Sequence, residues 1–260
     1  MARTRGIIPH LFAQWDRIAR RIRRSQRVVI FLDFDGTLVR VAPLPENVRL
    51  EDGMRENLRK LAAHRKVTLV VISGRQRADL QRFVGIRNVK YMGLYGWENN
   101  GNKRVRFPDR LALARALVEL LKDLPSYPGV WIEPKGNSFS VHLKGAGGET
   151  RRQVRQVVSK RVRPLRETLR VMTNLRDVEV APVAIGDKGV AVRKFLGRPG
   201  WQGALPIYFG DDLSDEPAFA AARKGIPILV GKRRATRARF CLRGPAEVAA
   251  ALSRLEEMIR

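Results

Sequence analysis

Short apolar runs alternate with amphipathic segments along the first hundred residues of the chain. The run RVVIFL predicts a buried strand over 27–32, and VTLVVI predicts a second strand that ends just before Ser73. Apolar positions at helical spacing predict helices over 51–63 and 76–84. Strands that alternate with helices in this way are typical of an α/β fold with a doubly wound parallel sheet.

The segment before the first strand has an amphipathic pattern with a strongly basic side. Apolar side chains recur at helical spacing at Ile8, Leu11, Trp15, Ile18 and Ile22. Arginines crowd the other positions: Arg17, Arg20, Arg21, Arg23 and Arg24. We expect a helix within residues 1–25 that packs against the core. Attachment of this basic helix to an anionic membrane surface is the alternative.

The pattern changes between residues 101 and 182. The predicted elements there are a helix over 110–122, strands over 130–134 and 138–143, a long helix over 149–168, and short strands near Val171 and Val178. We interpret this segment as an α/β cap domain inserted into a core made of 1–100 and 183–260. Neither boundary has a Ser/Gly-rich linker, which favours short hinges.

Two acids follow the first predicted strand directly, in the sequence DFDGTL. Asp33 and Asp35 would lie at the carboxyl edge of the sheet, where ligands bind in open α/β folds. One carboxylate can attack a phosphorus atom, while the other protonates the leaving oxygen and then activates water. Gly36 permits a tight turn, and Thr37 offers a hydroxyl to an anion. A divalent cation between the acids would relieve their repulsion.

Three later segments also place polar side chains at strand ends or helix starts. Ser73 and Gly74, in VISGR, can donate a hydroxyl and a backbone N–H to phosphate oxygens. Lys188, in IGDKGV, is expected at the start of a helix, where it can hold an anion. The strand LPIYF is followed by three acids, Asp211, Asp212 and Asp215. Oxygen ligands at this density suit Mg²⁺, so we predict a magnesium site.

The chain is strongly basic. Its 260 residues include 51 lysines and arginines against 25 acids, which gives a formal net charge of +26. Such a field attracts anions, including phosphorylated substrates, nucleic acid and anionic membranes. Because no nucleic-acid-reading module is recognisable and the arginines are scattered through every segment, we predict weak adhesion to polyanions but no specific nucleic-acid partner.

Composition also indicates the cellular compartment. No apolar run approaches the roughly 18–20 residues that cross a bilayer, so no transmembrane segment is expected. The N-terminus lacks the apolar core of a secretory signal. A single cysteine, Cys241, excludes an internal disulfide and fits a reducing compartment. These features predict a cytoplasmic protein and leave its oligomeric state open.

Taken in order, the four polar segments resemble the four motifs of the haloacid dehalogenase-like (HAD) phosphatases. The resemblance implies a Rossmann-like core in which Asp33 is the nucleophile that becomes an aspartyl-phosphate and Asp35 is the acid/base. It implies further that Ser73 and Lys188 hold the phosphoryl oxygens. The metal ligands that it implies are Asp33, the backbone carbonyl of Asp35, and Asp211, with Asp212 and Asp215 in support.

Within 28–219 the resemblance narrows to trehalose-6-phosphate phosphatases. The cap sequence WIEPKGNSFSVH has that family's E-x-K pair, here Glu133 and Lys135, and a strand that ends in His142, while DVEVAP supplies Glu179. GDDLSDEPAF is close to the family's fourth motif. The resemblance implies that the two glutamates and the lysine bind sugar hydroxyls. A surface pair of little energetic consequence is the alternative.

Three positions complicate this resemblance. Tyr95 stands where the family usually has a histidine, and Lys144 replaces an arginine two residues after His142. Arg75, in SGR, can reach the phosphate or the sugar, or can brace its loop; we predict a substrate-binding role. His142 is expected to orient a neighbouring cap side chain. These departures bear on the identity of the sugar more than on the phosphatase chemistry.

The sequence therefore predicts a Mg²⁺-dependent phosphomonoesterase that hydrolyses trehalose 6-phosphate to trehalose and phosphate, with the cap closing over the disaccharide. A HAD phosphatase for another sugar phosphate, such as sucrose phosphate or a glycosyl-phosphoglycerate, is the alternative within the same class. A basic binding protein on a phosphatase scaffold is the alternative from a different class. The presence of all the expected catalytic residues argues against that last alternative.

Overall fold

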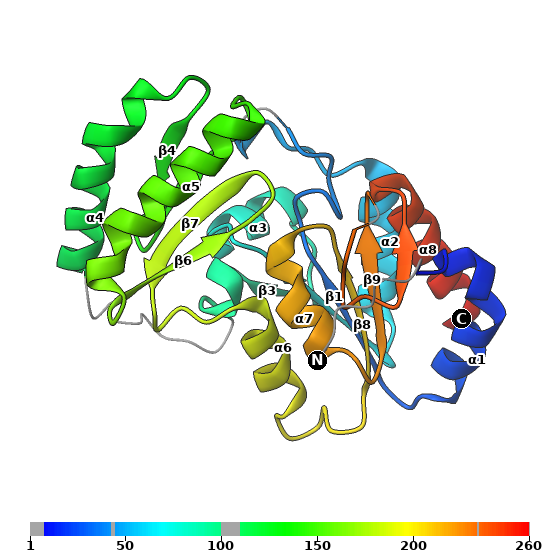
Figure 1. Ribbon diagram of the computed structural model, residues 1–260. Coiled ribbons are helices and arrows are strands. Elements are labelled where there is room, and N and C mark those ends of the chain that lie inside the picture. Colours follow the sequence, from blue (N-terminus) through cyan, green and yellow to red (C-terminus); the bar gives the residue numbers. More distant parts are fainter. Residues whose placement is uncertain (1–7, 43–44, 100–109, 233, 260) are drawn as a thin grey trace. The chain divides into compact units, whose positions relative to one another are not determined.

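The computed structural model describes residues 8–42, 45–99, 110–232 and 234–259. The chain forms two compact units, which are residues 1–101 with 186–260 (unit 1) and residues 102–185 (unit 2) (Figure 1). The start of the predicted cap, at residue 101, lies outside the described residues. Across the described ranges, no helix combines the length and apolar character that a membrane span requires.

Unit 1 is built on a parallel sheet with the strand order β10-β9-β8-β1-β2-β3. Its strands are β1 (Val28–Leu32), β2 (Val67–Ile72), β3 (Lys90–Met92), β8 (Leu205–Gly210), β9 (Ile226–Val230) and β10 (Phe240–Leu242). The chain runs outward from β1 to β3 and then returns to β8 on the other side of β1. Ligands of open α/β sheets bind at the carboxyl ends of the strands at such a switch in direction.

Helices pack on both faces of this sheet, as the apolar pattern predicts. Because successive side chains of a strand point to opposite faces, β1 supplies Ile30 and Leu32 to one core layer and Val29 and Phe31 to the other. The first layer contains α1 (Trp15–Arg24), α2 (Asp52–Ala63), α3 (Arg77–Val84) and α8 (Pro245–Ile259). The second contains α6 (Lys188–Leu196) and α7 (Glu216–Ala221). The doubly wound fold is confirmed.

The amphipathic N-terminal segment packs against the core, as predicted. Ile18 and Ile22 of α1 are buried in the first layer, so the apolar face of the helix is used inside the fold. The helix begins later than the spacing predicts, because a short 3₁₀ turn precedes it. His10 lies before this helix and forms a β-bridge with Cys241, and His64 directly follows the last residue of α2.

Unit 2 contains an antiparallel sheet with the strand order β4-β5-β7-β6. Its elements are α4 (Arg110–Asp123), β4 (Trp131–Pro134), β5 (Phe139–His142), α5 (Gly148–Val162), β6 (Leu169–Thr173) and β7 (Asp177–Pro182). One face of the sheet packs against both helices, with Phe139 and Val141 of β5 in the same apolar cluster as Val154 and Val158 of α5. Unit 2 therefore has a core of its own.

The long helix predicted over 149–168 ends six residues early, at Val162. The sequence Arg163–Leu165 forms a separate 3₁₀ turn, with Pro164 inside it. Because proline lacks the backbone N–H that an α-helix needs, the helix stops before it. The chain then enters β6 at Leu169, which extends the strand predicted near Val171 in both directions.

Candidate active site

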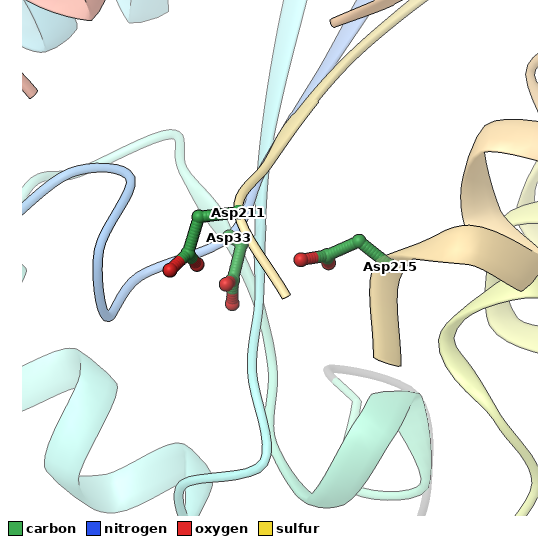
Figure 2. A group of neighbouring side chains, drawn as sticks. All are labelled: Asp33, Asp211 and Asp215. Atoms are coloured by element: carbon green, nitrogen blue, oxygen red, sulfur yellow. The ribbon is translucent and has the colours of Figure 1, made fainter. Parts of the chain in front are cut away.

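Three buried carboxylates meet at the switch between β1 and β8. Asp33 follows β1 and Asp211 follows β8, and the backbone N–H of Asp33 donates to the carbonyl of Phe209 at 2.9 Å, which ties the two strand ends together. Asp33, Asp211 and Asp215 each offer an oxygen within 4.8 Å of the others. Figure 2 shows Asp33 and Asp211 next to one another, with the Asp215 carboxylate pointing toward them from the other side.

Electrostatics at Asp33 favour binding of a positive charge. Burial, together with the neighbouring carboxylates of Asp215 and Asp211, raises the pKa of Asp33 well above its usual range, and Lys188 opposes the shift. The Lys188 ammonium lies 2.7 Å from Oδ1 of Asp33 and 2.8 Å from Oδ1 of Asp215. Burial alone would lower the pKa of Lys188, but the carboxylates of Asp215 and Asp33 outweigh it and raise that pKa.

Asp215 is held by donors from three directions. Oδ1 accepts from the Lys188 ammonium and from the hydroxyl of Tyr208 at 2.7 Å, and Oδ2 accepts from the backbone N–H of Asp212 at 2.9 Å. Asp212 itself caps the short turn at Leu213 and stands outside the group of three carboxylates. The sequence analysis missed Tyr208, whose signal is a lone hydroxyl in the otherwise apolar strand LPIYFG.

The carboxylate group fits a metal ion. Its donors are hard oxygens, which suit cations such as Mg²⁺, and it gathers three negative groups in a buried place where burial and mutual repulsion oppose their charge. Gly36 has a φ of +86°, and a Cβ there would fall onto the Asp211 carboxylate. The DFDGT turn therefore closes tightly over Asp211, which is possible only with glycine.

Asp35 lies apart from these three acids and binds Arg75. Nε and an Nη of Arg75 donate to the two oxygens of the Asp35 carboxylate at 2.6 and 2.7 Å. The guanidinium lies 5.4 Å from the ring centre of Phe34 and 5.3 Å from that of Phe83, which fixes its orientation. The structure thus joins the predicted acid/base to a residue predicted to bind substrate, and a contact of Arg75 with substrate stays a prediction.

The loop after β2 brings the predicted phosphate ligands to the same sheet edge. Ser73 is buried, and its hydroxyl accepts the backbone N–H of Arg75 at 3.2 Å. Gly74 lies against the Tyr95 hydroxyl, where a Cβ would be only 2.8 Å away. The hydroxyl of Thr37, also buried, has no hydrogen-bond partner among the described residues. A buried hydroxyl without a partner is costly unless a ligand completes it.

Two contacts that the sequence analysis missed brace this edge. Tyr95 adopts a φ of +58°, and its backbone N–H donates to the carbonyl of Ser73 at 2.9 Å. Arg234, beyond β9, donates to the carbonyl of Asp212 at 2.7 Å and pairs with Glu216. An arginine in the basic run GKRRATRAR gives no sequence signal for such a partner, because its neighbours are equally basic.

In unit 2, three predicted sugar ligands lie on the sheet face opposite to the apolar core. Lys135 donates to Oε2 of Glu179 at 2.9 Å and to the Ser140 hydroxyl at 2.6 Å, and Ser140 also donates to Glu179. Glu179 is fully buried, and its Oε1 has no hydrogen-bond partner in the part of the chain that the structure describes. Burial lowers the pKa of Lys135, but Glu179, Asp177 and Glu133 outweigh it and raise that pKa.

The carboxyl group of Glu133 forms a hydrogen bond with the imidazole of His142. Nε2 of His142 lies 2.8 Å from Oε2 of Glu133. The two strands β4 and β5 are antiparallel neighbours, which brings these side chains together on one face. The predicted role of His142, to orient a neighbouring cap side chain, agrees with this contact.

Comparisons with known proteins agree with this architecture. The chain matches the family model described as Trehalose-phosphatase over residues 31–246. It is 34% identical over 250 residues to the trehalose-phosphate phosphatases of Mycobacterium bovis and Mycobacterium tuberculosis, and the match covers 91% of the chain. The chain spans 63% of the length of those relatives.

Solved structures share the fold. The C-terminal domain of C. albicans trehalose-6-phosphate phosphatase matches with a TM-score of 0.85 at 21% identity, covering 98% of this chain and 99% of that one. The sucrose-phosphatase of Synechocystis matches with a TM-score of 0.58 at 16% identity, covering 90% and 98%. The sheet topology, the cluster of acids and the match over most of its length show that this chain belongs to the trehalose-phosphatase family.

Proposed function

We propose that this chain hydrolyses trehalose 6-phosphate to trehalose and phosphate through an aspartyl-phosphate on Asp33. The observation that carries the proposal is the buried Asp33 carboxylate, held by Lys188 beside Asp211 at the switch point of the sheet. Membership of the trehalose-phosphatase family supports the choice of sugar.

In the first step an Asp33 oxygen forms a bond to phosphorus while the bond between phosphorus and the sugar oxygen breaks. Asp35 donates its proton to that departing oxygen. In the second step Asp35 takes a proton from water, the water oxygen bonds to phosphorus, and the Asp33 carboxylate is released with free phosphate. The Arg75 guanidinium, which donates to both oxygens of Asp35, orients this carboxyl group in the site.

The remaining residues of the edge hold the phosphoryl group. Lys188, Ser73, Gly74 and the free hydroxyl of Thr37 donate to its oxygens, and the lysine offsets charge as the transition state forms. Asp33 and Asp211 would hold Mg²⁺, with the carbonyl of Asp35, while Asp215 and Asp212 position Lys188 and the loop. When bound, the ion supplies positive charge that offsets repulsion between the carboxylates and the phosphate.

The polar face of the unit 2 sheet would bind the sugar. Glu133 and Glu179 can accept hydrogen bonds from hydroxyls, and Lys135 can donate to them. The unpartnered Oε1 of Glu179 supports this role, because a fully buried carboxylate oxygen without a donor is costly when no ligand is bound. Unit 2 would therefore determine which sugar phosphate is hydrolysed.

The test is phosphate release from a panel of sugar phosphates, with and without Mg²⁺. The panel contains trehalose 6-phosphate, sucrose 6-phosphate, glucose 6-phosphate and a glycosyl-phosphoglycerate. The matched variants are Asp33→Asn and Asp52→Asn, since the Asp52 side chain is 87% exposed and is not among the proposed ligands. Each variant removes one carboxylate charge and nothing else.

We expect preferred hydrolysis of trehalose 6-phosphate that requires the metal, persists in Asp52→Asn and disappears in Asp33→Asn. Trapped phosphate on the protein, found by mass spectrometry and absent from Asp33→Asn, would support the covalent step. Hydrolysis of another sugar phosphate in preference to trehalose 6-phosphate would overturn the assigned sugar. Equal activity of Asp33→Asn and wild type would overturn the mechanism.

A further inference from the structure

One aromatic side chain on the polar face of unit 2 has no role in the mechanism above. Trp131 begins β4, two residues before Glu133, so both side chains point to the same face of the sheet. That face is the one opposite to α4 and α5, because the intervening Ile132 packs against the apolar core of unit 2. Trp131 therefore lies on the same surface as the proposed sugar ligands.

The indole is held in a fixed orientation. Trp131 pairs with His142 in the antiparallel register, and their rings stack with centroids 3.8 Å apart and planes only 17° apart. The same His142 binds Glu133 through Nε2 at 2.8 Å. One imidazole thus aligns an aromatic ring and a carboxylate side by side.

The Trp131 side chain is partly exposed to solvent. Trp131 is 39% exposed, and among the described residues it is the one aromatic side chain in the group of exposed large hydrophobic residues. This partly exposed indole lies on the same face of the sheet as Glu133 and Glu179. A flat apolar surface next to hydroxyl-binding groups matches a sugar ring, which has C–H groups on its faces and hydroxyls around its rim.

We propose that Trp131, held flat by His142, is the stacking surface for one sugar ring of the substrate, and that it determines the preference for a sugar phosphate over a small phosphate ester. The inference rests on the proposed function and extends it to a residue outside the glutamate and lysine set. The apolar face of the ring packs on the indole, while the hydroxyls at its edge reach Glu133. Stacking on the indole supplies contact area, and the hydrogen bonds to the Glu133 carboxylate orient the sugar ring.

The kinetic test compares Trp131→Ala, Trp131→Phe and a control, Leu111→Ala, with wild type. Leu111 is 62% exposed on α4, so the control removes exposed apolar surface elsewhere in unit 2. The substrates are trehalose 6-phosphate and p-nitrophenyl phosphate, which has no sugar. Thermal unfolding of each variant verifies that it folds.

For trehalose 6-phosphate we expect Trp131→Ala to raise KM by about tenfold with little change in kcat, and Trp131→Phe to recover most of the loss. Hydrolysis of p-nitrophenyl phosphate should be the same in all four proteins. An unchanged KM in a folded Trp131→Ala would overturn the stacking role while the proposed function stands. A parallel loss on both substrates would also overturn it, because it would indicate a structural role.

A binding measurement tests the stacking role of Trp131 even if trehalose 6-phosphate is not hydrolysed. Titration with trehalose should change the tryptophan emission of wild type in a saturable manner. Trp131→Phe lacks the reporting ring, so its emission should stay constant, whereas Leu111→Ala should respond like wild type. An equal response in Trp131→Phe would assign the signal to another tryptophan and overturn the proposal, and so would the absence of any response in wild type.

Discussion

Both units of this protein hold a lysine against carboxylates, but they assemble the pair differently. In unit 1, Lys188 contacts Asp33 and Asp215, which come from the ends of different strands, and all three side chains are buried. In unit 2, Lys135 contacts Glu179 across one face of an antiparallel sheet, and its side chain remains 15% exposed. The first contacts join the start of α6 to the segments that follow β1 and β8, whereas the second joins the residue after β4 to β7, with β5 between the two strands.

This difference agrees with the functions proposed for the two units, phosphate hydrolysis in unit 1 and sugar binding in unit 2. A parallel sheet is covered on both faces, so only its strand ends can carry polar groups, and these converge at the switch point to act on a small group such as a phosphate. An antiparallel sheet can leave one face polar, which presents several side chains over an area suited to a sugar. In the proposed function, the same kind of ion pair serves reaction chemistry in unit 1 and sugar recognition in unit 2.

The largest effect on stability and activity is expected from a substitution of Lys188. Lys188→Met leaves Asp33 and Asp215 buried without their cation, which should lower the free energy of unfolding by about 3–5 kcal/mol and abolish phosphate release. Urea unfolding and a phosphate assay measure both effects. Lys194→Met, on an exposed position of the same helix, is the control and should change neither. Retained activity in Lys188→Met would contradict the assigned phosphate contact.

The corresponding change in unit 2 should separate binding from chemistry. Lys135→Met leaves the buried Glu179 without its cation and should cost about 3 kcal/mol of stability. We expect KM for trehalose 6-phosphate to rise, while hydrolysis of p-nitrophenyl phosphate is unchanged. Lys160→Met, exposed on α5, serves as the control. If Lys135→Met lost activity on both substrates alike, the division of work between the units would be wrong.

A substitution of Gly36 tests whether Asp211 contributes to the proposed metal site of unit 1. In Gly36→Ala the added Cβ meets the Asp211 carboxylate, and the φ of +86° is unfavourable, so we expect a loss of about 2 kcal/mol in stability and weaker Mg²⁺ binding. The measurement is the Mg²⁺ concentration for half-maximal phosphate release. Gly231→Ala is matched, because its φ is +94° but nothing lies within 4 Å of the added Cβ. Equal Mg²⁺ requirements in the two variants would remove Asp211 from the proposed ligands.

The smallest effect is expected at Tyr208. Tyr208→Phe removes the hydroxyl that donates to Asp215, a loss of about 1.5 kcal/mol that should also reduce kcat, because Asp215 in turn holds Lys188. Tyr91→Phe is the control, since among the described residues the Tyr91 hydroxyl hydrogen-bonds to the backbone of Ile86. Stability should fall in both, as followed by thermal unfolding, but activity only in Tyr208→Phe. An unaffected kcat in Tyr208→Phe would show that Lys188 needs no such support.

Local patterns in the sequence were sufficient for the strands next to the site. The runs VVIFL and VTLVVI are apolar on both faces, which is typical of strands buried in a parallel sheet, and both appear as β1 and β2. The position of Lys188 at the start of α6 also followed from its neighbours. The end of α5 was wrong because a single proline outweighed helical spacing that continued beyond it.

The sequence by itself determined which side chains stand at strand ends and helix starts, since these positions depend on residues next to one another in the chain. Only the tertiary structure decided their partners: Arg75 on Asp35, Tyr208 on Asp215, and Trp131 on His142. Strand order places β8 beside β1, and antiparallel register places β4 against β5. Such pairings depend on packing between distant segments, so no local pattern of apolar and polar residues can specify them.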